Sequence, residues 1–220
     1  SIGKLKWIIE WRKGSKAVEK GLWADAIMHL NAAIALKPED AQCYFNRGLA
    51  FGGTGDFDNA IKDFNEVIRL DPNNRAAYNN LGTCYLRKNQ ISTALKHFKL
   101  ALKLDPNDIQ AQLNVGITYS KKSELADSKA KAKLLKLASG FLDQVINRDP
   151  NFPEAYQEKG ALQHQMGQYE EAITNFTKAI DLDNSYAEAY YSRGSAKKEL
   201  GYEKAAKRDL KTARDLGFTR

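Results

Sequence analysis

Residues 75–108, RAAYNNLGTCYLRKNQISTALKHFKLALKLDPND, contain the pattern that organises the whole chain. Their apolar residues recur every three or four positions in two stretches: Tyr78, Leu81 and Tyr85, then Ala94, Phe98, Ala101 and Leu102. Asn89, between the two stretches, is a residue type that ends helices or turns the chain. The segment therefore predicts two helices joined by a short turn.

The same pattern recurs along the chain. Prolines lie 34 residues apart at Pro38, Pro72 and Pro106, and then at Pro150 after 44 residues. Glycines follow the same spacing, including one interval of 44, at Gly14, Gly48, Gly82, Gly116, Gly160 and Gly194. Two residue types thus agree on six helical hairpins with a ten-residue insertion in the fourth. The predicted units are 7–40, 41–74, 75–108, 109–152, 153–186 and 187–220.

Side-chain sizes predict how each hairpin packs. The glycine of the first helix is expected to meet an alanine of the second, which allows the two helices to approach closely. That alanine series is Ala26, Ala60, Ala94, Ala138, Ala172 and Ala206. Large residues are expected to fill the remaining space: Tyr44, Tyr78, Tyr156 and Tyr190, with Phe64, Phe98, Leu142, Phe176 and Leu210.

The pattern resembles the tetratricopeptide repeat family, whose 34-residue units carry a small residue at position 8, alanine at 20, an aromatic at 24 and proline at 32. The resemblance covers residues 7–220. It implies an all-α, right-handed superhelical solenoid of six helix-turn-helix repeats, forming one domain over residues 1–220. The end units depart from the pattern, for example at Glu10 and Lys197, as expected where an outer neighbour is missing. We expect the stack to close naturally near Arg220, with Lys204, Lys207, Lys211 and Arg214 facing solvent.

Composition is that of a soluble globular chain, with 43% hydrophobic and 28% charged residues in 220. It predicts neither a membrane span nor an intact signal peptide, and the cytoplasm is the default compartment. Two cysteines, Cys43 and Cys84, lie too far apart along neighbouring helices to form a disulfide. The histidines His29 and His97 are expected to be surface imidazoles. We find no phosphate loop, zinc signature or nucleophile elbow, so we predict no catalytic residue, no metal and no cofactor.

By resemblance, a peptide or a segment of a partner protein is expected to bind in a concave groove lined by the first helices. Repeat position 6 of this groove gives Asn46, Asn80 and Asn114 in three consecutive units. An amide side chain can pair with the N–H and C=O of a peptide backbone, so this row resembles the asparagine ladder of other tetratricopeptide superhelices. The alternative is that these amides are solvated or bonded within their own helices.

Positions 5 and 9 of the groove add Phe45, Leu49, Asn79, Leu113 and Ile117. The apolar residues predict two exposed patches on either side of Asn80, where a partner peptide would place its apolar side chains. The alternative is that the neighbouring helices bury them. A chaperone tail is not an expected ligand, because the cationic clamp that grips a terminal carboxylate in this family is missing.

The net charge of +7 comes from three basic islands at residues 1–20, 121–136 and 193–220. They allow an alternative function, association with nucleic acid or an acidic surface, although such islands are more often solvated helix faces and aromatic residues for base stacking are sparse. A further alternative is the recognition subunit of an enzyme complex.

The insertion predicts an early start of the fourth unit's second helix, with Asp127 or Ser128 as N-cap. Its lysines either contact an acidic partner or keep a tolerated insertion soluble. The sequence indicates neither the partner nor the oligomeric state.

Overall fold

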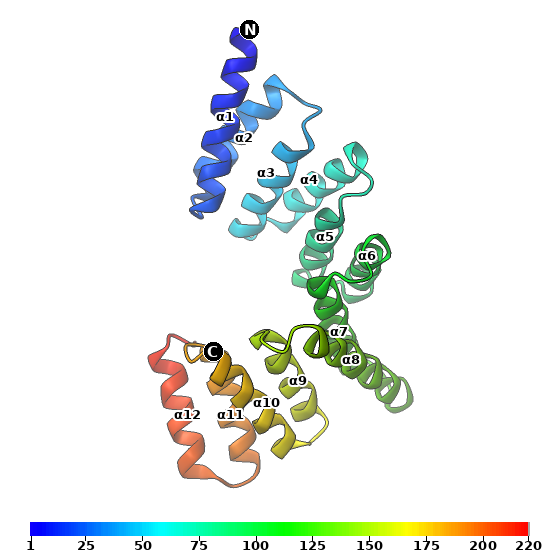
Figure 1. Cartoon of the computed structure of the whole chain (residues 1–220), viewed down its shortest axis with the longest axis vertical. Helices are drawn as coiled ribbons and strands as arrows, with labels where there is room; N and C mark the ends of the chain where they lie inside the picture. Colours follow the sequence, from blue (N-terminus) through cyan, green and yellow to red (C-terminus); the bar gives the residue numbers. More distant parts are fainter. Residues whose placement is uncertain (220) are drawn as a thin grey trace. The chain divides into compact units, whose positions relative to one another are not determined.

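The structure is a computed structural model that describes residues 1–219, and within them it contains twelve α-helices and no strand (Figure 1). The helices are α1 (Ile2–Glu19), α2 (Trp23–Leu36), α3 (Ala41–Thr54), α4 (Phe57–Leu70), α5 (Arg75–Arg87), α6 (Ile91–Leu104), α7 (Ile109–Glu124), α8 (Ser128–Arg148), α9 (Pro153–Gln165), α10 (Tyr169–Leu182), α11 (Ala187–Glu199) and α12 (Glu203–Asp215). Each predicted unit contains one helical hairpin, so the all-α repeat fold is confirmed. The first helix begins earlier than predicted, because the Ser1 hydroxyl accepts a hydrogen bond from the backbone N–H of Lys4 at 3.2 Å and caps it.

Contacts divide the chain into two compact units, Ser1–Ala111 and Gln112–Arg220, called unit 1 and unit 2 below. The division falls inside α7. Unit 1 contains α1 to α6, and each of these helices packs against the next. Unit 2 contains most of α7 and all of α8 to α12, and α8 to α12 also pack in sequence. Repeat positions in both units are counted from the first residue of each predicted repeat.

The glycine at repeat position 8 makes room for a large side chain of the second helix. A Cβ atom on Gly82 would lie 2.5 Å from the ring of Phe98, and one on Gly160 would lie 2.6 Å from the ring of Phe176. The side chain met is thus the one at position 24 and not the predicted alanine at position 20, although in the last repeat the Ala206 backbone oxygen also lies 3.2 Å from a Cβ built on Gly194. The alanines at position 20 are nonetheless fully buried in the same interface, as Ala94 is.

The tyrosines at repeat position 4 fasten the connection between consecutive hairpins. Each hydroxyl donates a hydrogen bond to the backbone carbonyl six residues earlier, which belongs to the proline slot. The four bonds are Tyr44 to Pro38 (2.9 Å), Tyr78 to Pro72 (3.3 Å), Tyr156 to Pro150 (2.9 Å) and Tyr190 to Asn184 (3.3 Å). The half-buried tyrosines therefore do more than fill space. Each one links the first helix of its own repeat to the proline slot of the preceding repeat.

Each unit contains a largely buried ion pair between repeat positions 7 and 23. In unit 1 the Arg47 guanidinium donates two hydrogen bonds to Asp63, at 2.9 and 2.7 Å. In unit 2 Arg193 does the same to Asp209, at 2.8 Å for both bonds. Both arginines also reach position 25 of the preceding hairpin: Arg47 donates to Asn31 at 2.8 Å, and Arg193 to Thr177 at 3.1 Å. The pairs therefore hold consecutive hairpins together.

The insertion extends the second helix of the fourth repeat, as predicted. Helix α8 has 21 residues, against 14 in α10. Asp127 is its N-cap, because its carboxylate accepts a hydrogen bond from the N–H of Ala130 at 2.9 Å. Only the later part of the helix is buried, around Leu142, whereas Leu125 just before the helix is 76% exposed. The insertion therefore adds helix without adding to the core.

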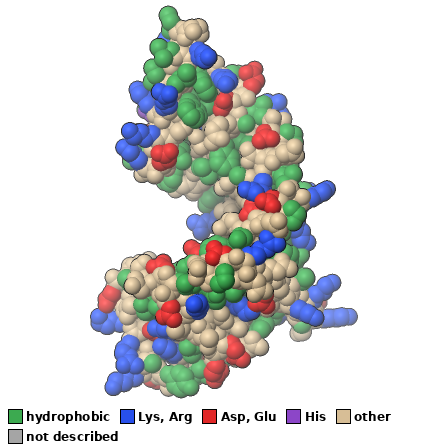
Figure 2. Space-filling model, viewed as in Figure 1, with side chains coloured by type: hydrophobic (Ala, Val, Ile, Leu, Met, Phe, Trp, Pro, Cys, Tyr) green, Lys and Arg blue, Asp and Glu red, His purple; other side chains and the backbone are tan. Residues whose placement is uncertain are grey.

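Basic side chains lie on outward faces of unit 2. Figure 2 shows Lys and Arg side chains on the α12 side and on the α8 side. The predicted stripe of α12 is fully exposed, which confirms that it faces solvent: Lys204, Lys207, Lys211 and Arg214. Within the described residues, no helix is both long and apolar enough to cross a bilayer.

Candidate functional site

The three asparagines of the predicted row differ in their surroundings. Asn46, on α3, is 9% exposed, and its amide is engaged within the protein. Its Nδ2 atom donates to the Ser15 hydroxyl on α1 at 3.0 Å, and its Oδ1 atom accepts from the Gln42 amide at 3.1 Å. Asn46 therefore joins two neighbouring first helices, and little of its amide faces a partner.

Asn80 and its neighbour Asn79 are both half-buried on α5. The Nδ2 atom of Asn80 donates to the carbonyl of Ala76 at 2.8 Å, which matches the alternative of an amide bonded within its own helix. Asn79 donates to the carboxylate of Asp108 at 3.1 Å, while its Oδ1 atom is buried with no hydrogen-bond partner. Asn114, on α7 in unit 2, is also half-buried, and its backbone carbonyl accepts from the Thr118 hydroxyl at 2.6 Å.

The expected exposed apolar patches are mostly covered. Leu113 is 3% exposed, so its prediction as an exposed groove residue was wrong. Phe45 packs edge-on against the ring of Phe64, with the ring centroids 5.6 Å apart. Leu49 packs against the same cluster, and Ile117 is half-buried. The physical reason is that a side chain at the margin of a helix face is covered once neighbouring helices pack beside it.

Unit 1 has a pocket between its first helices α3 and α5. Its volume is about 300 Å³, and the ring of Phe64 from α4 lies in its wall. Two predicted residues, Leu49 and Asn80, line this one pocket. The complete lining is Gly48, Leu49, Gly52, Phe57, Phe64, Asn80, Thr83, Cys84 and Arg87.

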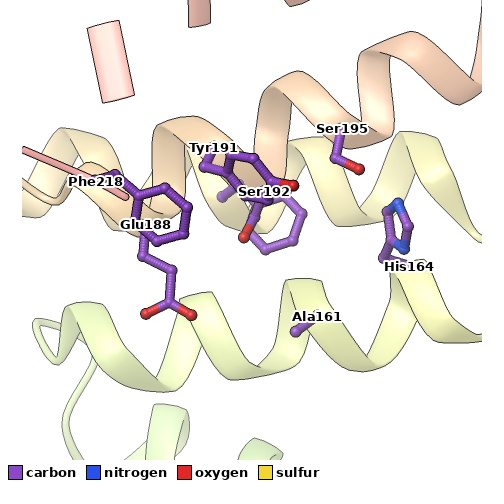
Figure 3. A pocket seen from close by; sticks show the side chains of 8 residues that line it. Ala161, His164, Glu188, Tyr191, Ser192, Ser195 and Phe218 are labelled. Atoms are coloured by element: carbon purple, nitrogen blue, oxygen red, sulfur yellow. The ribbon is translucent and has the colours of Figure 1, made fainter. Parts of the chain in front are cut away.

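Unit 2 has a pocket of about 210 Å³ between α9 and α11 (Figure 3). Glu188, Tyr191 and Phe218 gather at one end, and His164 lies at the other, beside Ser195. The lining is Ala161, His164, Phe176, Glu188, Tyr191, Ser192, Ser195 and Phe218. None of these residues was predicted as a site residue, although Tyr191 and Ser192 occupy repeat positions 5 and 6 and could have been selected by the same rule.

The two pockets occupy equivalent places in their repeats. Each lies between two consecutive first helices, above the aromatic ring at position 24. Five lining positions correspond: Leu49 with Ala161, Gly52 with His164, Phe64 with Phe176, Asn80 with Ser192, and Thr83 with Ser195. The repeat therefore builds one pocket twice and supplies it with different side chains.

Two buried polar groups at the unit 2 pocket have unused hydrogen-bonding capacity. Gln157 is 2% exposed, and its Nε2 atom donates to the Ser192 hydroxyl at 3.1 Å, whereas its Oε1 atom has no hydrogen-bond partner. The Nε2 atom of His164 is buried and likewise has no partner. A buried polar atom without a partner destabilises the fold around it, so hydrogen-bonding capacity remains unused beside this pocket.

The unit 2 pocket adjoins an acidic region. Burial and the nearby charge of Glu188 raise the pKa of Glu158, on α9, to about 7, while Lys121 has a smaller opposing effect. Burial also raises the pKa of Tyr186, and Glu188, Glu158 and Glu154 add to the increase. The carboxylates of Glu158 and Glu188 therefore repel each other beside this pocket.

The cysteines and two of the histidines have structural surroundings. Burial raises the pKa of the Cys43 thiol to about 12 and that of Cys84 to about 11, and both cysteines are free. His29 and His97 are each half-buried at the surface, and each contacts a neighbouring side chain. His29 contacts the carboxylate of Glu10 at 2.7 Å, and the ring of His97 stacks on Tyr85 at 5.1 Å. Within residues 1–219, no group of three His, Cys, Asp or Glu side chains is arranged to hold a metal ion.

Comparisons with known proteins identify the family. A TPR repeat model matches residues 14–55 and 162–201, and two tetratricopeptide repeat models match residues 45–109 and 141–174. The chain belongs to the tetratricopeptide repeat family. The comparison with curated protein sequences gave no match.

Several solved structures share the fold. PilW, described as a widely conserved type IV pilus biogenesis factor, has a TM-score of 0.80 at 19% identity, over 100% of this chain and 96% of that one. A tetratricopeptide repeat protein from Parabacteroides merdae also has a TM-score of 0.80, at 18% identity, over 97% of this chain and 80% of that one. YrrB, described as a TPR protein with an unusual peptide-binding site, has a TM-score of 0.57 at 22% identity, over 86% of this chain and 92% of that one.

Proposed function

We propose that the protein is a non-enzymatic scaffold that binds an extended segment of a partner protein along its first helices. The observation that carries this proposal is the pair of equivalent pockets, each opening between two consecutive first helices. Pockets that recur at a fixed repeat position suit a ligand that also repeats, as a polypeptide backbone does.

The unit 1 pocket has the surfaces that an apolar side chain and its backbone need. Leu49, Phe57 and Phe64 provide apolar walls. At the rim, Asn80 uses one amide hydrogen within its own helix, which leaves a second hydrogen and the amide oxygen to pair with a peptide group. Arg87, with its guanidinium 6.0 Å from the ring of Phe57, adds a cation that favours an acidic neighbour in the ligand.

The other predicted contacts contribute unequally to this proposal. Asn114 and Ile117 are half-buried on α7, at the positions that Asn80 and Thr83 occupy on α5, and we retain them as proposed contacts. Asn79, with its buried and unpartnered oxygen, is retained as well. Asn46 and Phe45 are proposed to support the face by holding neighbouring helices in place.

The proposal assigns no reaction to either pocket. The two thiols have raised pKa values of about 12 and about 11, so they remain protonated and weakly nucleophilic at neutral pH. The fold shared with YrrB, which is described as having an unusual peptide-binding site, supports a peptide as the ligand.

Selection from a random twelve-residue peptide library displayed on phage tests the proposal, with the full chain immobilised. We expect enriched peptides, and we expect Asn80→Ala and Leu49→Ala to weaken those that use the unit 1 pocket by about tenfold, since each removes one good contact. Asn184→Ala is the matched control, because this exposed asparagine lies in a loop outside both pockets. A library that yields no enriched peptide would contradict the proposed function.

A further inference from the structure

Within residues 1–219, the Glu188 carboxylate at one end of the unit 2 pocket forms no ion pair with a Lys or Arg side chain. Glu188 lines the pocket, and its charge helps to raise the pKa of Glu158 on the neighbouring first helix. Among the described residues, no Lys or Arg forms an ion pair with either carboxylate or with Glu154. Lys121 interacts electrostatically with Glu158, but burial and Glu188 outweigh it and the pKa stays raised. In the part of the chain that the structure describes, these carboxylates therefore have no ion-pairing cation.

The same end of the pocket presents two stacked aromatic rings. The ring centroids of Tyr191 and Phe218 lie 4.6 Å apart, with an angle of 29° between the planes. Figure 3 shows these rings next to Glu188. An aromatic face attracts cations through its quadrupole, and it also packs well against an aliphatic stem. A carboxylate beside two rings thus suits a long cationic side chain better than an inorganic ion.

A metal ion fits this region poorly. Divalent cations need several oxygen ligands that converge on one point. The described residues contain no group of three acidic, His or Cys side chains with that arrangement. The rings of Tyr191 and Phe218 offer no ligand atom to a hard cation, whereas they contribute directly to binding a guanidinium or ammonium group.

We propose that the unit 2 pocket binds an arginine or lysine side chain of the partner segment, with its cationic head beside Glu188 and its stem against Tyr191 and Phe218. This inference rests on the proposed function and adds the class of ligand. Glu158 strengthens the attraction from the neighbouring helix. His164 lines the same pocket, and Gln157 holds the Ser192 hydroxyl of its lining through a hydrogen bond of 3.1 Å.

The equivalent pocket of unit 1 carries the opposite charge. Arg87 is part of its lining, and no carboxylate lines it. A peptide with one cationic side chain is therefore expected to bind unit 2 in preference to unit 1. This makes the unit 1 pocket an internal control for the inference.

The phage library described above, panned on the full chain, supplies the probe. We expect the enriched peptides to share an arginine or lysine. Replacing that arginine by citrulline, which has nearly the same shape but no charge, is expected to weaken binding by a few fold in fluorescence anisotropy, because Glu188 is exposed and an exposed charge pair contributes little. Glu188→Gln is expected to weaken the arginine peptide equally and to leave the citrulline peptide unchanged.

Glu171→Gln is the matched control, because Glu171 is an exposed glutamate on α10 that does not line the pocket. Circular dichroism verifies that the variants keep their helix content. Enriched peptides without a cation, or arginine peptides that bind Glu188→Gln as tightly as the native chain, overturn the inference and leave the proposed function standing. A library without any enriched peptide removes both.

Discussion

The pockets of the two units are built on the same repeat positions and differ in the side chains that finish them. At position 9 unit 1 has Leu49 and unit 2 has Ala161, and at position 12 unit 1 has Gly52 and unit 2 has His164. The lining charge changes from an arginine in unit 1 to a glutamate in unit 2. The aromatic residue at position 24, present in both pockets, thus sets where the pocket lies. The residues that differ, such as those at positions 9 and 12, determine which groups line it.

The two units also differ in the number of cations that surround the aspartate of the ion pair at positions 7 and 23. Asp63 of unit 1 has one cationic partner, Arg47, and burial prevails, so the pKa of its carboxyl is raised. Burial also acts on Asp209 of unit 2, but Arg193 and Lys197 together outweigh it and lower the pKa. The second cation at Asp209, together with the charge of Glu66 that raises the pKa of Asp63 alone, accounts for the opposite directions of the two shifts.

The largest effect is expected from breaking these ion pairs. Removing one partner of a buried pair costs about 3–5 kcal/mol, because the other charge is left buried without a counter-charge. We expect Asp209→Ala to lie at the upper end of that range and Asp63→Ala at the lower end, since Asp209 leaves two cations unpaired. Urea unfolding followed by circular dichroism measures both.

Asp58→Ala is the control for the ion-pair comparison. Asp58 pairs with Lys88, but its side chain is 74% exposed, so the loss is expected to stay below about 1 kcal/mol. A cost for Asp63→Ala that equals or exceeds the cost for Asp209→Ala would refute the role assigned to the second cation.

The next effect concerns pH and Glu158. Its pKa is raised from 4.5 to about 7, so between these values the native state binds more protons than the unfolded state. The stability of unit 2 is therefore expected to fall as pH rises from about 4.5 to about 7 and to change little above that. Glu158→Gln is expected to remove this dependence and to stabilise the protein at pH 8 by up to about 3 kcal/mol, at about 1.4 kcal/mol per pKa unit.

Amide hydrogen exchange at several pH values localises the effect of Glu158 after correction for intrinsic exchange rates. Protection in α9 and α10 should change with pH, whereas protection in α3 and α4 should show no such component, because Asn46 and Asn80 occupy the equivalent position in unit 1. An equal response of the two regions would contradict the assignment to Glu158.

A smaller effect is expected from the glycines that make room for the position 24 ring. A Cβ on Gly160 would lie 2.6 Å from the Phe176 ring, and one on Gly48 would lie 3.0 Å from the Phe64 ring. Overpacking costs about 1–3 kcal/mol and is offset by about 1 kcal/mol of helix preference for alanine. We expect Gly160→Ala to destabilise by about 1–2 kcal/mol and Gly48→Ala to lie within about 1 kcal/mol of the native chain. Thermal unfolding compares them, and equal losses would show that the spacing difference has no energetic consequence.

The smallest effect is expected from exchanging the lining charge of unit 1. Arg87→Glu gives the exposed rim of that pocket the sign found in unit 2, so it is expected to increase binding of an arginine peptide there by a few fold, as exposed charge pairs contribute little. The measurement is made with Glu188→Gln in the background, which removes the unit 2 site. Tighter binding of the citrulline peptide by the same factor would exclude charge as the cause.

Sequence spacing predicted the hairpins well because the features that set it are local. Proline and glycine intervals located six units, and the cap at Asp127 was placed correctly, since a cap depends on residues within one helical turn. The side chain that packs against the glycine at position 8 was predicted incorrectly for most repeats. Which side chain crosses an interface depends on the rotation of the helix about its axis, and sequence spacing does not define that rotation. The ion pairs of Arg47 and Arg193 went unnoticed for the same reason.

The candidate site could be predicted only in part. Leu49 and Asn80 were chosen from their repeat positions and lie in one pocket, whereas Leu113 was chosen by the same rule and is buried. The sequence by itself determined the family, the number of repeats and the helix order, because these follow from local periodicity. The tertiary structure decided which first-helix residues stay accessible and which carboxylates share a region, because burial and charge proximity depend on residues that are distant along the chain.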